Sequence, residues 1–479
     1  MSEVTKPILK DETFERLIGK QNSLLASMVR QNTPTELDWY LMEEYAHEGI
    51  FGDLFSFGDK VVDVWRDTVA NQEYSFPWRL NHIGQYNLAD GEVIDNRPCL
   101  QLHYATPFGV QFSHQRAIHA VSYKVTTALV SGQKYNFAYE GKYINFTVPS
   151  GGVEVGYWLG YRESYIDIYS PIGNLLKSVS CSVDSSAGGT SLGSAPTLEA
   201  KEYYFTLESS WGSNAVAGAV VSFTLSTPLK FGEKICGCYG MPDQSKSSWK
   251  IYTYAKDGKT QIESALSTGE STAGTYLGVL GYDKAKSGGD YLLRNMQEVA
   301  YGYNRYSMSA VRQFLNSSLG VGLWWKPMDM FDIAPDQLTT KAGFLSGCSE
   351  AFINVIKPVA VKTYLNTVQD AEIGEYEITY DKVFLPSLEE MYITPQKAGE
   401  GESHEYWVRR SGRTSPLPWY TPTPEYVTYA VENHTSAQPV RLRSASRGNS
   451  YNTWNVNSSG YVYSSNATGA HRFSPLVVL

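Results

Sequence analysis

Residues 448–470 read GNSYNTWNVNSSGYVYSSNATGA and contain no Lys, Arg, Asp or Glu. The few apolar residues recur with period two on both sides of Ser458-Ser459-Gly460. This pattern predicts a β-hairpin with a three-residue loop, in which Gly460 supplies the left-handed residue. Closing the loop defines three cross-strand pairs: Asn457 with Tyr461, Val456 with Val462, and Asn455 with Tyr463. Each pair then falls on one face of the hairpin, as a sheet requires.

The same alternation divides the hairpin into two faces. Trp454, Val456 and Val462 are expected to face the core. The outward face is then formed by four residues: Asn455, Asn457, Tyr461 and Tyr463. Exposed Tyr, Ser and Asn are typical of recognition surfaces, because Tyr gives rigid contact area and Ser and Asn give adaptable hydrogen bonds. The alternative is a solvated hairpin or a low-complexity tail, but a tail would not keep the apolar residues in phase.

The composition of the whole chain is that of a folded protein. It has 479 residues, of which 42% are hydrophobic and 19% charged, and its 35 Tyr and 41 Gly favour β-structure. A net charge of −9 argues against a general nucleic-acid binder, which needs a basic footprint. No apolar run has membrane-spanning length, and the first residues lack the apolar core of a signal peptide. We therefore expect synthesis in the bacterial cytoplasm, no signal peptide and no membrane insertion.

Changes in residue composition and hydrophobic periodicity along the chain predict a multidomain protein, mainly β with some α. Residues 1–50 are expected to form an N-terminal helical anchor or oligomerisation segment, and residues 51–183 a sandwich-like β-rich domain. A second β-rich region is expected at 195–285 and a C-terminal α+β domain at 289–479. A Gly/Ser-rich link is expected at 184–194. Residues 11–32 place apolar side chains on one helical stripe, which suits either a short three-stranded coiled coil or a helix packed on its own domain.

Cysteine and carboxylate patterns give no sign of a cofactor. The five cysteines are scattered, so we expect core residues and no disulfide framework: Cys99, Cys181, Cys236, Cys238 and Cys348. No His pair at zinc spacing accompanies Cys236-Gly-Cys238. His114 and His119 have near-helical spacing but no acidic third ligand. No metal and no cofactor are therefore expected.

Short motifs in the last two fifths of the chain carry a family resemblance. In order they are Leu315-Asn316, Trp324-Trp325, Phe384-Leu-Pro-Ser387, Trp407-x-Arg409, Leu442-Arg-Ser444, Trp454-x-Val456, Gly460-x-Val462 and Arg472-x-x-Pro475. This order resembles a C-type-lectin-like domain over roughly residues 289–479. The most similar version occurs in phage and bacterial proteins, some diversified by retroelements, such as phage tropism determinants. A weaker resemblance to the β-rich front half of such virion proteins rests on Phe55-Ser-Phe-Gly-Asp59, Gln101-Leu-His103, Gln111-Phe112 and Tyr135-Asn-Phe137.

The resemblance implies roles for the hairpin residues. Adenine-directed mutagenesis in such proteins yields Asn, Ser, Tyr, Thr and similar residues at the ligand-binding positions. The matching positions here are Asn449, Ser450, Tyr451, Asn452, Thr453, Asn455, Asn457, Tyr461, Tyr463, Ser464 and Asn466. The positions that match the fixed scaffold are Trp454, Val456, Gly460, Val462, Arg443 and Arg472.

Several chemistries known on this fold do not match the sequence. Calcium-dependent sugar binding needs acidic ligands, yet Val440 follows Gln438-Pro439 and Val456 follows Trp454-Asn455. Formylglycine-generating enzymes use a cysteine pair, and only Cys348 lies in this region. Glu389 and Glu390 are adjacent, so their side chains diverge and joint acid–base work is not expected.

Basic residues outnumber acidic ones after residue 400. The cations are Arg409, Arg410, Arg413, Arg441, Arg443, Arg447 and Arg472, against Glu402, Glu405, Glu425 and Glu432. This local charge suits an acidic cell-surface polymer. For Arg443 and Arg472 a bracing role through backbone hydrogen bonds is the preferred interpretation, and the others stay open.

The sequence therefore predicts a non-enzymatic, receptor-binding or adhesin-like virion protein. Its expected partners are a host cell-surface protein or glycan, other virion proteins through the N-terminal region, and further copies of itself. One alternative is a structural decoration protein whose head packs only against its neighbours. A carbohydrate-degrading tail enzyme that grips glycan with its aromatics is a third hypothesis.

Overall fold

The computed structural model describes residues 36–479 except 120–122, 163, 172–174, 330, 369, 372 and most of 196–300, where it describes six strands and a few further positions. The protein is mainly β, with several sheets and short helices. The apolar stripe predicted at residues 11–32 lies outside the described residues.

The first described helix, α2 (Glu36–His47), begins the core of the protein. Trp39 and Met42 are buried, and the Trp39 ring meets Phe352 edge-on at a centroid distance of 4.9 Å. The sequence of residues 35–51, TELDWYLMEEYAHEGIF, predicts a helix, and α2 confirms it. The aromatic and β-branched residues of 51–65 predict strand from Phe51 onward, but α3 (Phe51–Leu54) is a helical turn, since Phe51 and Leu54 both reach the core from one side.

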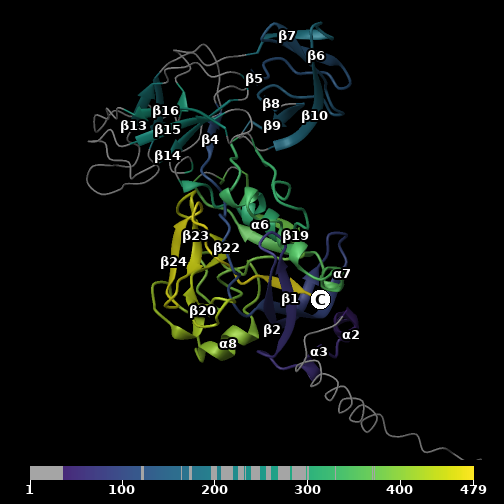
Figure 1. Ribbon diagram of the computed structural model, residues 1–479, viewed down its shortest axis with the longest axis vertical. Coiled ribbons are helices and arrows are strands. Elements are labelled where there is room, and N and C mark those ends of the chain that lie inside the picture. The colour runs from purple at the N-terminus through teal and green to yellow at the C-terminus, as the bar shows by residue number, and fades with distance from the viewer. Residues whose placement is uncertain are drawn as a thin grey trace, which may run out of the picture.

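A four-stranded sheet with order β1-β2-β3-β25 joins the two ends of the described chain. Its strands are β1 (Lys60–Asp67), β2 (Gln72–Asn87), β3 (Val93–Leu102) and β25 (Leu476–Val478). The register of the last pair sets Leu476 opposite Gln101 and Val478 opposite Cys99. In Figure 1 the C-terminus accordingly lies in the part of the molecule that carries this sheet.

Residues 301–479 add short helices and three small sheets. The helical elements are η1 (Tyr306–Met308), α6 (Ala310–Leu315), η2 (Asp336–Thr339), η3 (Phe344–Gly347), α7 (Glu350–Val355), α8 (Glu405–Ser411) and η4 (Pro424–Tyr426). The sheets pair β18 (Val359–Tyr364) with β19 (Tyr376–Asp381), β20 (Thr428–Tyr429) with β21 (Ala437–Gln438), and β22 (Val440–Ala445) with β23 (Asn452–Val456) and β24 (Val462–Asn466). The sequence predicts a helix with a Ser cap within residues 303–316 and another in SEAFINVIKPV at 349–359. Helices α6 and α7 confirm both, and Ser309 and Ser349 cap them by accepting backbone N–H groups.

One buried cluster connects these parts. It includes Trp39, Trp78, Leu100, Phe314 and Val477, all at most 1% exposed. The core therefore crosses the boundaries expected at residues 50/51 and near 289. We call residues 36–119 and 301–479, which share it, the body.

The middle of the chain forms sheets of its own, drawn away from the body in Figure 1. A seven-stranded sheet has the order β11-β6-β7-β10-β9-β8-β5. Its strands are β5 (Tyr123–Lys124), β6 (Lys134–Tyr139), β7 (Lys142–Thr147), β8 (Trp158–Arg162), β9 (Tyr165–Tyr169), β10 (Leu175–Asp184) and β11 (Thr190–Ser194). The link expected at 184–194 is wrong in part, because Thr190–Ser194 pairs in parallel with β6. The pattern GVQFS at 109–113 also predicts a strand, and this prediction is wrong, since none is assigned there.

Two further sheets contain the strands described between residues 202 and 282. Their orders are β13-β12-β17 and β16-β15-β14-β4. The strands are β4 (Ala117–His119), β12 (Glu202–Thr206), β13 (Val220–Thr224), β14 (Lys234–Cys238), β15 (Trp249–Tyr254), β16 (Gln261–Ser267) and β17 (Gly281–Tyr282). The aromatic and β-branched residues of EYYFTLES, AVVSFTLS and WKIYTYA predict strands at 202–209, 219–226 and 249–255, and β12, β13 and β15 confirm them.

Two further findings concern the cysteines and the helices of the described residues. Cys99, Cys181 and Cys348 are free thiols. Among the described residues no helix is long and apolar enough to cross a membrane.

Candidate ligand-binding hairpin

Strands β23 and β24 form the hairpin predicted from the sequence. Asn455 lies opposite Tyr463 and Val456 opposite Val462, and the Asn457 N–H donates to the Tyr461 carbonyl at 3.0 Å. Gly460 has a φ of 74°, and a Cβ there would lie 1.9 Å from the Thr423 carbonyl oxygen. Both the left-handed backbone and the close approach therefore require glycine at this position.

The face expected to be buried is buried. Trp454, Val456 and Val462 are at most 2% exposed and pack in a cluster with Trp407 and Tyr426. The Trp454 indole N–H donates to Gln396 Oε1 at 3.3 Å. These contacts fix the position of the hairpin on the body.

The opposite face is not outward at Asn455, and this corrects the expectation. Asn455 and Thr453 are fully buried, because Arg441 from β22 and the segment after β24 cover them. Asn455 Nδ2 donates to Ser465 Oγ at 2.6 Å, and Arg441 donates to Thr453 Oγ1 and to the Gly469 carbonyl. Burial lowers the pKa of Arg441 to about 9. At Thr453 and Asn455 the second face is thus a buried polar layer.

The loop before β23 is also held in place, by hydrogen bonds from a buried asparagine. Asn304, which is fully buried, donates its Nδ2 to the carbonyls of Ser446, Asn449 and Asn452. Ser450 and Tyr451 are buried with it, so Tyr451 is not the surface anchor that the sequence suggested. Sequence reasoning missed Asn304, because nothing local marks an Asn far upstream as a clamp for this loop.

Two asparagines of the predicted set stabilise turns. Asn449 Oδ1 accepts the N–H groups of Tyr451 and Asn452 at 3.2 and 2.7 Å. Asn457 Oδ1 accepts the Ser459 and Tyr461 N–H groups, both at 2.9 Å. The oxygens of these side chains are therefore engaged within the protein.

Seven predicted ligand-binding residues remain partly exposed, and four are buried. The first group is Asn449, Asn452, Asn457, Tyr461, Tyr463, Ser464 and Asn466, and the second is Ser450, Tyr451, Thr453 and Asn455. Tyr461 and Tyr463, two positions apart, share the face that carries Asn455, at its solvent-facing edge.

Tyr420 extends this surface and was missed from the sequence. Its N–H donates to the Val462 carbonyl at 3.0 Å, which places it on the free edge of β24. Its ring, in a residue that is 56% exposed, lies 5.7 Å from that of Tyr461. Its φ is 60°, a left-handed conformation that is unusual for a bulky side chain. Such strain persists only where the surroundings hold it, and it is frequent at binding sites.

The scaffold arginines brace the body. Arg443 is 1% exposed, forms a bidentate pair with Glu390 and donates to the carbonyls of Leu385 and Glu400. Arg472 donates to the Thr106 carbonyl at 3.0 Å and to Glu432 at 2.7 Å. Both side chains connect segments that are far apart in sequence.

Other groups considered from the sequence have structural partners. Glu389 accepts the N–H groups of Gly399 and Glu400, whereas Glu390 faces Arg443, so the two carboxylates diverge. His114 lies 3.4 Å from Asp336. No group of three or more His, Cys, Asp or Glu side chains that could hold a metal occurs among the described residues.

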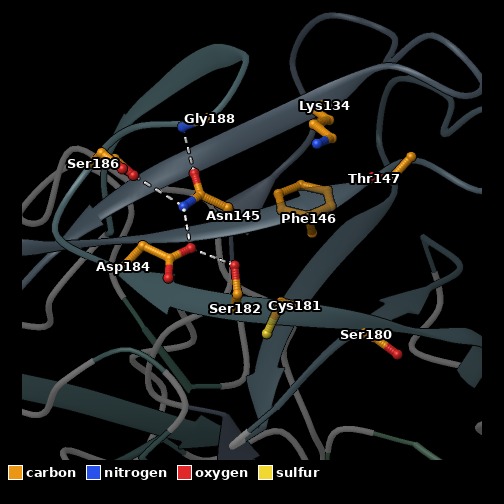
Figure 2. Close-up of a pocket in the computed structure, with 10 residues that line it drawn as sticks. All are labelled: Lys134, Asn145, Phe146, Thr147, Ser180, Cys181, Ser182, Asp184, Ser186 and Gly188. Carbon is orange, nitrogen blue, oxygen red and sulfur yellow. Dashed lines mark hydrogen bonds between the residues drawn. The ribbon is translucent and has the colours of Figure 1, made fainter.

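A pocket of ≈ 460 Å³ lies on the seven-stranded sheet, between β7, β10 and the turn before β11. Figure 2 shows Asn145 at its centre, bonded to Asp184, Ser186 and Gly188. Ser182 Oγ also donates to Asp184, and these hydrogen bonds lower the pKa of that carboxyl. The polar groups thus satisfy one another and hold residues 186–188 against the sheet.

The comparison with protein families gives one match. Residues 289–475 match the family described as "Domain of unknown function (DUF6273)". No curated protein and no solved structure matches the chain. Residues 289–475, which include the whole hairpin, are thus similar to that family.

Proposed function

We propose that the protein is a non-enzymatic, receptor-binding protein of a phage virion, which displays a Tyr/Asn/Ser surface on a C-type-lectin-like scaffold. The observation that supports this most is the surface formed by Tyr420, Tyr461 and Tyr463 at the edge of the hairpin. Trp454 and Arg441 fix the hairpin from its two faces, so these three rings are displayed by a rigid support. We call this set the tyrosine surface.

The chemistry of the tyrosine surface suits recognition of a protein or glycan. Tyrosines lose little entropy on binding and offer both a ring and a hydroxyl. Ser464 and Asn466 are partly exposed on the other face of β24 and offer further hydroxyl and amide groups on the same strand. A rigid support also reduces the cost of ordering on binding.

The test is attachment of the labelled protein to a panel of bacterial strains, measured by flow cytometry. In strains that bind the unmodified protein, the triple variant Tyr420→Ser, Tyr461→Ser, Tyr463→Ser is expected to bind at least about a hundredfold more weakly, because Tyr is a frequent hot-spot residue. The matched control replaces three exposed tyrosines elsewhere: Tyr40→Ser, Tyr165→Ser and Tyr380→Ser.

Both variants should keep the melting temperature of the unmodified protein. Chelation of calcium should leave attachment unchanged, since Val440 and Val456 stand where carboxylates would be needed. Normal attachment by a folded triple variant would refute the tyrosine surface and favour a structural decoration protein.

Oligomerisation through residues 11–32 can be tested by truncation. Because Trp39 and Met42 belong to the core, the shortened chain should start at Pro34 rather than beyond α2. The full chain is expected to sediment as a trimer and the shortened chain as a monomer, which would lower the avidity of attachment. Equal masses for the two chains would exclude this segment as the assembly device.

A further inference from the structure

Four cationic or imidazole side chains meet at the seam between the four-stranded sheet and α8. They are Lys60 from β1, Arg79 from β2, His103 just after β3, and Arg410 from α8. Lys60 and Arg410 are exposed, His103 is half-buried and Arg79 is 4% exposed. We call them the cationic cluster.

The hydrogen bonds of His103 reveal a surplus of donors. Its Nδ1 lies 3.1 Å from Arg79 Nη1, and its Nε2 lies 2.9 Å from Lys60 Nζ. A neutral imidazole has one N–H and one acceptor nitrogen, yet both nitrogens here face cationic donors. At least one donor therefore lacks an acceptor on the imidazole while Lys60 is charged.

Burial and neighbouring positive charges lower pKa values within the cluster. Burial, then Arg79 and Lys60, lower the pKa of His103 to about 3. Burial, then Arg79 and Arg410, lower the pKa of Lys60. Burial lowers the pKa of Arg79 to about 10. His103, Lys60 and Arg79 therefore give up their protons more readily than usual, first because of burial and then because of their positive neighbours.

No carboxylate neutralises the cluster in the described part of the chain. Within it, Lys60, Arg79 and Arg410 form no ion pair, whereas Arg305, Arg312 and Arg443 each contact an acidic side chain. Asp59, the nearest acid in sequence, accepts the Ser56 N–H at 2.8 Å.

Arg79 is held by neutral groups instead. It donates to Asn81 Oδ1 and Gln101 Oε1, both at 2.8 Å, and its guanidinium lies 3.7 Å from the centroid of the Tyr406 ring. The Arg410 guanidinium lies 6.0 Å from the same ring. A buried cation without a counter-ion lowers the free energy of unfolding, so a role in folding does not explain why Arg79 lies here.

We propose that the cationic cluster binds an oxyanion, a carboxylate, sulfate or phosphate group, through Lys60 and Arg410 with Arg79 behind them. The exposed ends of Lys60 and Arg410 supply point-charge and planar donors, and the anion supplies the acceptors that His103 lacks. This site shares no residue with the tyrosine surface and does not depend on it.

Anion binding should be linked to protonation. A bound anion favours the charged forms, so it raises the lowered pKa of Lys60 and of His103. The groups that set the charge of the site are Lys60, Arg79, His103, Arg410 and, against His103, His434. Affinity is therefore expected to fall as the pH rises through the lowered pKa of Lys60.

The test uses the full chain and calorimetric titration with inorganic sulfate, inorganic phosphate and acetate, then with dextran sulfate, polygalacturonate and neutral dextran. Dextran sulfate and polygalacturonate should both bind, and neutral dextran should not. The polymer that binds more tightly shows whether the site prefers sulfate or carboxylate. The double variant Lys60→Gln, Arg410→Gln should lose at least about tenfold in affinity, since each removes a charge-assisted hydrogen bond. The matched control is Lys142→Gln, an exposed lysine at the start of β7.

A stability readout separates binding from a structural role. Lys60→Gln should leave the melting temperature unchanged or raise it, because it removes repulsion from Arg79 and offers His103 an amide. The tyrosine triple variant should bind the anions normally, so failure of one proposal leaves the other standing. Equal anion affinity in the double variant and the unmodified protein, or a lower melting temperature for Lys60→Gln, would overturn the site.

Discussion

Val477→Asp is expected to prevent the body from folding. Val477 is fully buried opposite Leu100, in the strand that joins the last residues to β3. An unpaired buried carboxylate costs several kcal/mol, against a total stability of about 5–15 kcal/mol for a typical domain. The matched control is Val183→Asp, which changes a valine that is 38% exposed in β10.

Hydrogen exchange, resolved strand by strand, checks this result. Amides of β2 and β3 should lose protection in Val477→Asp and keep it in Val183→Asp. Protection of β3 in both variants would mean that β25 adds little to the shared core.

Arg443→Leu is expected to destabilise the body by about 3–5 kcal/mol at neutral pH, because it leaves Glu390 and Glu400 buried without their cation. Burial already raises the pKa of Glu400 in the unmodified protein. Without Arg443 the pKa of Glu400 should lie still further above the unfolded value of about 4.3. The cost of burying its charge is then small below the unfolded pKa and grows as the pH rises from that value through the raised pKa.

Urea unfolding at pH 4.5 and pH 7.5 measures this dependence. The deficit of Arg443→Leu should be larger at pH 7.5. The double variant Arg443→Leu, Glu390→Leu should recover part of it, since one of the uncompensated charges is gone. A deficit that is equal at both pH values would show that lost packing, rather than the buried carboxylates, sets the cost.

The hairpin shows which features a local sequence pattern can predict and which it cannot. Its register, its glycine and its buried Trp454 follow from period two and loop length, which are local properties. The pattern did not reveal that Arg441 and the segment after β24 cover Asn455, because alternation distinguishes two faces without showing what packs on each.

Long-range contacts account for the other differences. Asn304 holds the loop at 446–452, and Tyr420 lies on the edge of β24, yet neither has a sequence signal that points to the hairpin. The cationic cluster likewise gathers Lys60, Arg79, His103 and Arg410 from four elements. The excess of arginine after residue 400 indicated positive charge, but not the partners that the N-terminal sheet supplies.

The pairing of β3 with β25 has a consequence for synthesis. Cys99 leaves the ribosome long before Val478, and at about 5–20 residues per second the interval is roughly 20–80 s. During that time β3 is an open sheet edge with apolar residues such as Leu100 and Leu102, a template for pairing with other chains. The nascent protein therefore depends on protection of this edge, so slow translation should lower its soluble yield and a holdase chaperone should restore it.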